Sequence, residues 1–176
     1  MFVDLPGFAR RARLAGGHTL VELLVVLGLA AIATTLAVPT FRDLGANVRR
    51  DAVVEELRAS LLLARTEAVS RGVPVVVCPS ADGRACRAEP AWSRGWLVRT
   101  RGPARERDAP LAGVRVNGLV AVHATRASVE FQPTASAGTT ATFNVCDARG
   151  APAARAVIVS RTGRVRVARA PEARCG

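Results

Sequence analysis

The sequence has no tyrosine and no lysine, and only 4% of its 176 residues are aromatic. Because unpaired bases are held largely by stacking on aromatic rings, this scarcity argues against that mode of nucleic-acid binding. The sequence also has no C-x-x-C pair, no G-x-S-x-G motif and no phosphate-binding glycine loop. These absences remove common sequence signals of a zinc site, a serine hydrolase and a nucleoside triphosphatase. We therefore expect no catalytic residue, no bound metal and no cofactor.

Negative charge is scarce relative to positive charge. There are 25 basic residues, all of them arginine, against 14 acidic residues, and the formal net charge is +11. This excess suggests a polyanionic partner, although a basic surface that only keeps the protein soluble fits the charge equally well. A chain of this length buries one modest core, which favours a single domain with appendages over two full domains.

Only one hydrophobic run is long enough to cross a bilayer, Leu20–Val38, and Glu22 is its only charged residue. The rest of the chain therefore reads as a domain tethered at its N-terminus. A cleaved secretory signal, with an A-x-A site at Ala31-Ile32-Ala33, is one interpretation of the run. A plain signal anchor, held by the arginines before it, is another. Neither accounts for Glu22.

The segment from Gly17 to Leu24, with the sequence GHTLVELL, resembles the class III leader of type IV pilins and pseudopilins. The resemblance implies that a prepilin peptidase cuts after Gly17, that His18 becomes the first, N-methylated residue, and that Glu22 is the fifth. The family usually has Phe or Met where this chain has His18. An intramembrane carboxylate needs a partner, and the resemblance implies that Glu22 neutralises the terminal amine of a neighbouring subunit during filament assembly. It also implies a matching family proline at Pro39.

Apolar residues at helical spacing continue beyond the run and predict one helix from about Leu20 to about Ser70, ended by Arg71-Gly72. The predicted apolar stripe comprises Val48, Ala52, Val53, Leu57, Leu61, Ala64, Ala68 and Val69. The predicted divisions are a leader at 1–17, a transmembrane half-helix at 18–40, an amphipathic half-helix at 41–72 and a β-rich head at 73–176.

Short β-branched runs between turn residues predict eight strands in the head. They are Val73–Cys78, Gly95–Thr100, Val114–Val116, Leu119–Val122, Ser128–Phe131, Thr140–Val145, Ala156–Ser160 and Arg164–Ala168. The expected fold class is therefore α+β, with a long N-terminal helix packed on an antiparallel sheet or small sandwich. The resemblance implies that this is the type IV pilin fold. Trp92 and Trp96 are expected to pack in the core, and His123 is expected to be a structural histidine.

Four cysteines lie in the predicted head. In an exported domain an even number favours disulfides. The expected pairs are Cys78–Cys86, across a short loop, and Cys146–Cys175, which would tie the C-terminal tail to a strand. Four cysteines allow three disulfide pairings, and a zinc site is the alternative to disulfides.

Three later segments extend the resemblance to the GspH/FimT branch of minor pilins and pseudopilins: VPVVVC, WSRGWLV and AVIVSRTGRVRV. The branch holds two functions. FimT-type proteins belong to type IV pili, and some bind DNA in natural transformation. GspH-type proteins cap or initiate the pseudopilus of type II secretion.

The last segment predicts a hairpin with strands Val157–Ser160 and Arg164–Val167 around the loop Arg161-Thr162-Gly163. Period-two alternation puts Arg164 and Arg166 on one face and the two valines on the core face. Gly163 to Arg166 matches the GRxR motif of DNA-binding FimT proteins, which implies that both arginines contact DNA. The proposed contact set is completed by Arg155, Arg161 and Arg169. A solvated strand face in an arginine-rich protein is the alternative.

These patterns predict a FimT-like minor pilin that binds DNA phosphates without sequence preference. Its partners would be other pilins in a filament, prepilin peptidase, DNA and, before assembly, inner-membrane lipid. The single membrane pass would leave the head in the periplasm and later on the pilus surface. The alternative is a GspH-like pseudopilin of type II secretion.

Overall fold

The structure is a computed structural model that describes residues 19–87, 91–101 and 110–175. The chain forms two compact units, which meet between Arg42 and Asp43, and each is described by itself. Gly17 and His18, the predicted cleavage site, lie outside the described residues. The division of the chain into four segments, made from the sequence, stays a prediction. The second unit comprises the C-terminal part of the helix and all the described strands.

One long helix, α1 (Leu20–Arg71), agrees with the predicted helix to within one residue. Thr19 caps its start, because the backbone N–H of Glu22 donates to Thr19 Oγ1 at 3.2 Å. Thr19 and Glu22 have the spacing of a capping box, a helix-start signal that the sequence analysis did not use. The helix continues through Pro39. By length and composition it is apolar enough to cross a membrane.

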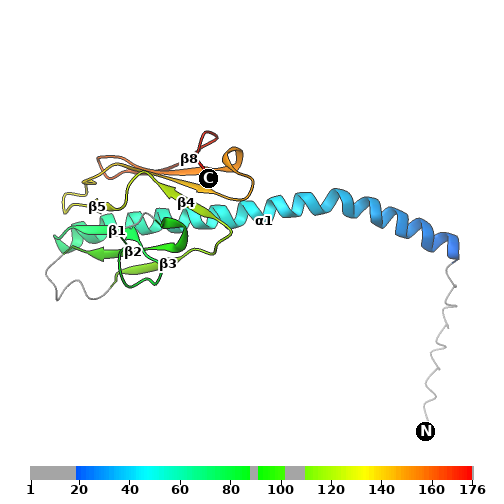
Figure 1. The fold of residues 1–176 in the computed structure, drawn as a ribbon, viewed down its shortest axis with the longest axis horizontal. Helices are drawn as coiled ribbons and strands as arrows, with labels where there is room; N and C mark the ends of the chain where they lie inside the picture. Colours follow the sequence, from blue (N-terminus) through cyan, green and yellow to red (C-terminus); the bar gives the residue numbers. More distant parts are fainter. Residues whose placement is uncertain (1–18, 88–90, 102–109, 176) are drawn as a thin grey trace, which may run out of the picture. The chain divides into compact units, whose positions relative to one another are not determined.

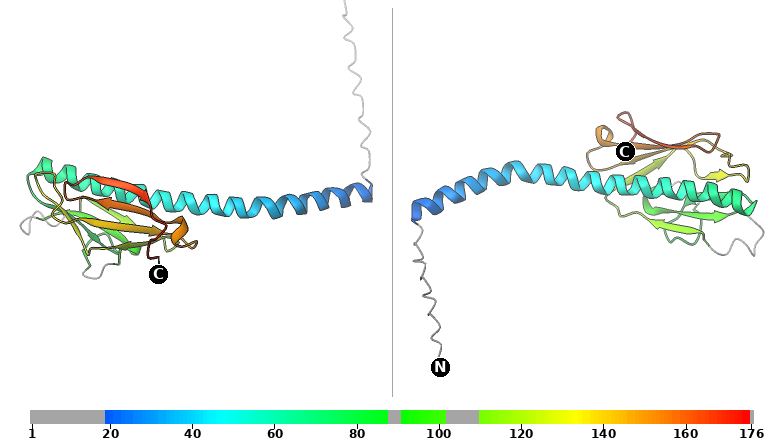
Figure 2. Two further views of the ribbon diagram at one scale, coloured as in Figure 1. Left: turned by 90° about the horizontal axis from the view of Figure 1, so that it is seen from above. Right: turned by 180° about the vertical axis from the view of Figure 1, so that it is seen from behind.

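The described residues form eight strands in two four-stranded antiparallel sheets. The sheets are seen in Figure 1 and from two further sides in Figure 2. Sheet A has the order β3-β2-β1-β5 and sheet B the order β4-β6-β7-β8. The strands are β1 (Val75–Pro79), β2 (Gly95–Thr100), β3 (Ala112–Arg115), β4 (Ala121–Ala124), β5 (Val129–Phe131), β6 (Ala141–Cys146), β7 (Arg155–Val159) and β8 (Val165–Arg169).

All eight predicted strands are present, and the predicted fold class is confirmed. β2 has the predicted bounds, and the other strands begin or end within two residues of theirs. The helix ends as expected, because Gly72 adopts a left-handed conformation with φ +64°. Two turns of 3₁₀ helix, Trp92–Arg94 and Ala151–Ala153, were not predicted.

One hydrophobic core joins α1 to the inner faces of both sheets. The helix residues buried there recur at intervals of three and four: Val54, Leu57, Leu61, Ala64 and Ala68. Val75, Phe131, Phe143 and Val157 are among the strand residues that meet them. Figure 1 shows β8 of sheet B above this part of α1 and β2 and β3 of sheet A below it.

The predicted apolar stripe of the helix was wrong at both ends. Val48 is 62% exposed, Val69 is 50% exposed and Ala52 is exposed as well, whereas Val54, which the prediction omitted, is buried. The sheets cover a narrower face of α1 than the apolar pattern alone indicates, so valines at its margins stay outside the core. Arg50 and Ser60 are buried instead.

Both tryptophans lie in the core, as predicted, and each indole N–H has an acceptor. Trp96 Nε1 donates to Ser60 Oγ on α1 at 2.9 Å, and Trp92 Nε1 donates to the carbonyl of Arg126 at 3.1 Å. Trp92 also meets Phe143 edge to face, with ring centroids 4.8 Å apart. Because both donors are satisfied, the two large rings add apolar contact area without leaving a buried N–H unpaired.

Two disulfides join the pairs expected from the sequence. Cys78 is bonded to Cys86, with Cα atoms 5.5 Å apart, and Cys146 to Cys175, with Cα atoms 5.7 Å apart. All four thiols are used, so none remains as a thiolate ligand for zinc. The second disulfide fastens the C-terminal tail to β6.

An ionic network joins the buried Arg50 of α1 to the turn that follows β6. Asp147, whose side chain is 5% exposed, lies 2.6 Å from Arg149 Nη2 and 3.7 Å from Arg50 Nη1. The hydrogen bond from Arg149 is the main reason why the pKa of Asp147 falls below its usual value. Arg149 Nη2 also donates to Asn47 Oδ1 at 2.8 Å, and Arg50 Nη1 to the carbonyl of Ala153 at 2.8 Å. The network therefore fixes the helix to sheet B.

Replacing Ser60 with alanine tests the buried indole contact. Ser60→Ala leaves Trp96 Nε1 without its acceptor inside the core, and we expect a loss of about 1–3 kcal/mol in the free energy of unfolding. Denaturant unfolding of the full chain in non-ionic detergent, followed by tryptophan fluorescence, measures this. Ser70→Ala is the matched control, because Ser70 is exposed on the same helix. Equal stability of the two variants would contradict the assignment.

The pH dependence of stability tests the network around Asp147. Since the folded state lowers this pKa, the stabilisation is present above the usual aspartate pKa of about 3.9 and is lost as pH falls through the lower folded-state pKa. We therefore expect Asp147→Asn to be less stable than wild type near neutral pH, with the difference shrinking below about pH 4. Unfolding measured across this range checks it, and a difference independent of pH would rule out the ionic origin.

Candidate functional site

The predicted hairpin is formed by β7 and β8, with a tight turn at residues 161–163. Ser160 and Arg164 close it, because Ser160 N–H donates to the carbonyl of Arg164 at 3.0 Å. The N–H of Gly163 donates to the carbonyl of Ser160 at 2.9 Å, and Ser160 Oγ accepts from the N–H of Arg164 at 3.2 Å. The glycine has φ +72°, a left-handed conformation that other residues rarely adopt.

Gly163 is also required by its neighbours. A Cβ added to it would lie 2.2 Å from the carbonyl oxygen of Ala135, which cannot move freely because Arg65 Nε on α1 donates to the same oxygen at 3.1 Å. The N–H of Ala137 donates to the carbonyl of Arg161 at 3.1 Å. The turn is thus held against residues 135–137, and the glycine of the GRxR segment has a packing role that the sequence did not indicate.

The two faces of sheet B have different environments. Val157 pairs with Val167 and Val159 with Val165, so these four side chains share the inner face that meets α1. Val165 packs on the core, but Val167 is 39% exposed because β8 is the edge strand of the sheet. The prediction that both β8 valines face the core is therefore right in direction, but Val167 is only partly buried.

Arg164 and Arg166 lie on the outer face of sheet B, as the alternation predicts. Arg166 is opposite Ile158 in the ladder, one position out of phase with the buried Val157 and Val159. Both arginines are exposed, as is Arg161 in the turn. Within the described part of the chain, none of these three guanidinium groups makes a hydrogen bond or an ion pair. They are available to an external anion.

Arg155 and Arg169 do not join them. The two residues are directly opposite each other in the β7–β8 ladder, in phase with Val157 and Val167, and so belong to the inner face. They line a hollow of about 400 Å³ next to α1. This arginine hollow is lined by Asn47, Arg50, Arg149, Pro152, Ala153, Arg155 and Arg169. The predicted DNA-contact set is thus divided between two surfaces.

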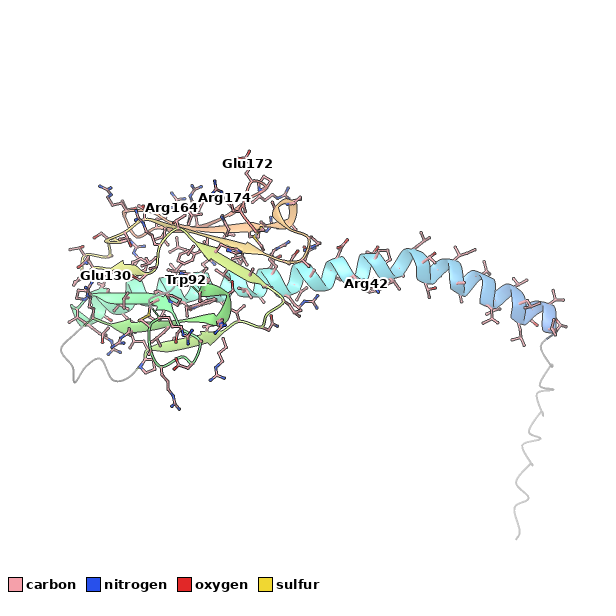
Figure 3. All side chains as sticks on the ribbon, in the orientation of Figure 1. Arg42, Trp92, Glu130, Arg164, Glu172 and Arg174 are labelled. Carbon is pink, nitrogen blue, oxygen red and sulfur yellow. A yellow bond between two sulfur atoms is a disulfide. The ribbon has the colours of Figure 1, made fainter. Side chains whose placement is uncertain are left out.

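The C-terminal tail brings another arginine to the outer face. Cys146 is one residue beyond the inward-facing Val145, so its disulfide draws Cys175 to the outer side of sheet B. The N–H of Ala170 donates to the carbonyl of Ala154 at 3.1 Å and sets the path of the tail. Figure 3 shows Arg174 and Glu172 on the same side of the molecule as Arg164. The position of Arg174 beside Cys175 is the sequence feature that connects this arginine with sheet B, because Cys175 is bonded to Cys146 of β6.

We define the outer arginine surface as Arg161, Arg164, Arg166 and Arg174. Its only acidic neighbour labelled in Figure 3 is Glu172, which makes no ion pair with any described residue. Guanidinium groups stay charged at all physiological pH values, and their paired donors match the oxygens of phosphate. The surface is therefore suited to bind polyanions.

His123, which the sequence analysis expected to be a structural histidine, lies in β4. It is exposed and pairs with Asn144 across the β4–β6 ladder. Among the residues described, no group of three or more His, Cys, Asp or Glu side chains is arranged to hold a metal ion.

A known protein family matches the sequence of this chain. The family model described as type II transport protein GspH matches residues 53–163, more than half of the chain. No curated protein sequence matches significantly.

Two solved structures share the arrangement of helix and strands. The type IV minor pilin FimU of Pseudomonas aeruginosa is 21% identical, with a TM-score of 0.54 over 67% of this chain and 91% of FimU. The minor pseudopilin EpsH from the type 2 secretion system of Vibrio cholerae is 13% identical, with a TM-score of 0.53 over 71% of this chain and 99% of EpsH. The chain therefore belongs to the GspH family and has the fold of type IV minor pilins and pseudopilins.

Proposed function

We propose that the protein is a minor pilin of a type IV pilus that captures DNA through the outer arginine surface. The observation that carries this proposal is the exposure of Arg164 and Arg166 on one face of an edge strand, with no described acidic partner. Arginines that only made the sheet soluble would gain from pairing with nearby carboxylates, as Arg101 does with Glu130 in sheet A. An unpaired cluster favours an external polyanion.

Binding would be to the phosphate backbone. The surface offers guanidinium forks and no aromatic ring, since the phenylalanines of β5 and β6 and both tryptophans are buried in the core. Contacts of this kind fix position without reading bases, so all sequences bind alike. If about three phosphates are neutralised, the logarithm of the binding constant falls with the logarithm of salt concentration with a slope of about −2.7. One head binds weakly, and several heads along a filament gain by avidity.

The rigidity of the surface supports its use in binding. The turn is fixed by the contact of Gly163 with Ala135, and the tail by the Cys146–Cys175 disulfide. The arginines therefore lose little backbone freedom when they meet a ligand, which lowers the entropic cost of binding.

Filament assembly requires the N-terminal half of α1. In our proposal prepilin peptidase cuts after Gly17, and the chain stays in the inner membrane, with its head in the periplasm, until it joins other pilins. Glu22 then meets the terminal amine of a neighbouring subunit, because a carboxylate in an apolar environment is tolerated only with a partner. Its place in the first turn of α1 keeps it near the end of the span before assembly.

The second candidate is a minor pseudopilin of type II secretion, which the family match favours. In that case the outer arginine surface would meet other pseudopilins or secreted protein. DNA binding distinguishes the two candidates.

Neutralising the hairpin arginines tests DNA binding. We expect the double variant Arg164→Gln and Arg166→Gln to weaken binding to short duplex DNA of any sequence and to reduce the magnitude of the salt slope by about 1.8, since each lost phosphate contact contributes about 0.9. Gel shift and fluorescence anisotropy on the full chain in non-ionic detergent, at several salt concentrations, measure both effects.

The matched control is Arg94→Gln with Arg115→Gln, which removes the same charge from exposed positions at sheet A. It should change the affinity and the salt slope much less. Equal losses in the two double variants would mean that net charge alone drives binding, and absence of binding in wild type at low salt would favour the secretion candidate.

The N-terminus of the exported chain tests the leader. We expect intact-mass spectrometry to give a mature chain that begins at His18, and Gly17→Ala to leave the leader attached because the peptidase requires the glycine at the cut. A chain beginning at Thr34 would indicate a cleaved secretory signal. The apolar helix would then be lost, and both filament candidates with it.

A further inference from the structure

The arginine hollow is a second basic site, on the opposite face of sheet B from the outer arginine surface. Its central feature is the direct cross-strand pairing of Arg155 with Arg169. Like charges placed opposite each other in an antiparallel ladder destabilise the sheet. Nearby carboxylates are therefore needed to offset the repulsion between Arg155 and Arg169.

Two of the four guanidinium groups in the hollow are already engaged. Arg50 is bonded to Asp51, with Nη2 2.8 Å from Oδ1, and to the carbonyl of Ala153. Arg149 is bonded to Asp147 and Asn47 and lies 3.5 Å from Asp43. The hydrogen bond with Asp147 raises the pKa of Arg149 further above its usual value. These two arginines have little capacity left for a new ligand.

Arg155 and Arg169 are able to bind a further ligand. Arg155 Nε lies 3.8 Å from Asp51 Oδ1, which is an ionic contact and too long for a hydrogen bond. The side chain of Arg169 is exposed and makes no ion pair or hydrogen bond with any described residue. The side chains of Arg155 and Arg169, from adjacent strands, thus border a hollow of about 400 Å³.

The hollow has one more positive than negative charge. Its four arginines are in contact with three carboxylates, those of Asp43, Asp51 and Asp147, so one positive charge is in excess. A single additional carboxylate would balance the site and would give Arg169 a partner. A phosphate dianion would carry one negative charge too many beside the three existing carboxylates, which favours a carboxylate over inorganic phosphate or a phosphate monoester.

We propose that the arginine hollow is a docking site for one carboxylate from an acidic side chain of a neighbouring protein subunit. Arg155 and Arg169 bind it through charge-assisted hydrogen bonds, while Arg50 and Arg149 are positioning residues held by α1 and the turn after β6. Because the hollow and the outer arginine surface lie on opposite faces of sheet B, a protein partner and DNA are bound independently. The proposal does not depend on DNA binding, and holds for a pilus or a pseudopilus.

The probes are acetate and a blocked Gly-Glu-Gly tripeptide, added to the full chain in non-ionic detergent micelles. Arginine Nε–Hε resonances are followed by NMR, with chloride used to keep the ionic strength constant. We expect saturable shifts of the Arg155 and Arg169 signals with both probes and no saturable shift of Arg94, which is exposed near sheet A. The proposal is overturned if either probe fails to give saturable shifts of the Arg155 and Arg169 signals, or if the Arg94 signal shifts equally. Tighter binding of inorganic phosphate than of acetate overturns the choice of a carboxylate.

Variants separate this site from the DNA surface. Arg169→Gln should weaken acetate binding about tenfold, and Arg169→Lys, which keeps the charge but loses the fork, should weaken it by less. The matched control, Arg164→Gln with Arg166→Gln, should leave acetate binding unchanged although it reduces DNA binding. Both Arg169 variants alter an exposed position, so an unchanged spectrum elsewhere verifies the fold. Acetate affinity that falls equally in the control overturns the assignment to the hollow.

Discussion

The packing of one narrow stripe of α1 against the inner faces of both sheets is the interaction on which the rest of the head depends. Leu57, Leu61 and Ala64 are fully buried there, together with Val157 and Val159 of β7. Once these valines face the helix, alternation along β7 and β8 decides which side chains point outward. Burial of a few aliphatic residues therefore determines the environment of every arginine in the hairpin.

The hairpin consequently carries two basic surfaces with different chemistry. On the outer face the guanidinium groups have no described carboxylate partner and are exposed. On the inner face Arg155 lies 3.8 Å from Asp51 of α1, and Arg149 in the turn after β6 brings the carboxylates of Asp43 and Asp147 close by. The turn between the strands is fixed by the close approach of Gly163 to Ala135, and the tail by Cys146–Cys175. A rigid edge hairpin of this kind is able to present one face to a filament neighbour and the other to a polyanion.

Local patterns were sufficient for much of this fold. The helix and the eight strands follow from periodicity and turn residues, which are properties of neighbouring residues. The two cysteine pairs agree with the expected ones, although the sequence left three pairings open. What could not be predicted depends on contacts between distant segments. Arg155 and Arg169 are an exception, because alternation continued from Val157 and Val167 already puts both on the inner face, as the strand register shows, and their assignment to the DNA surface did not follow it. Val48 and Val69, by contrast, fit the helical stripe, but the extent of the sheets leaves them exposed.

The central claim is that the outer face of sheet B, and no other basic region of the head, receives the phosphate backbone. Arginine modification by phenylglyoxal, quantified for each residue by mass spectrometry with and without duplex DNA, tests this on the unaltered chain. The account predicts that DNA slows modification across the outer arginine surface while Arg94 and Arg115, at sheet A, keep their rates. Protection confined to those two residues, or spread evenly over all exposed arginines, would contradict it.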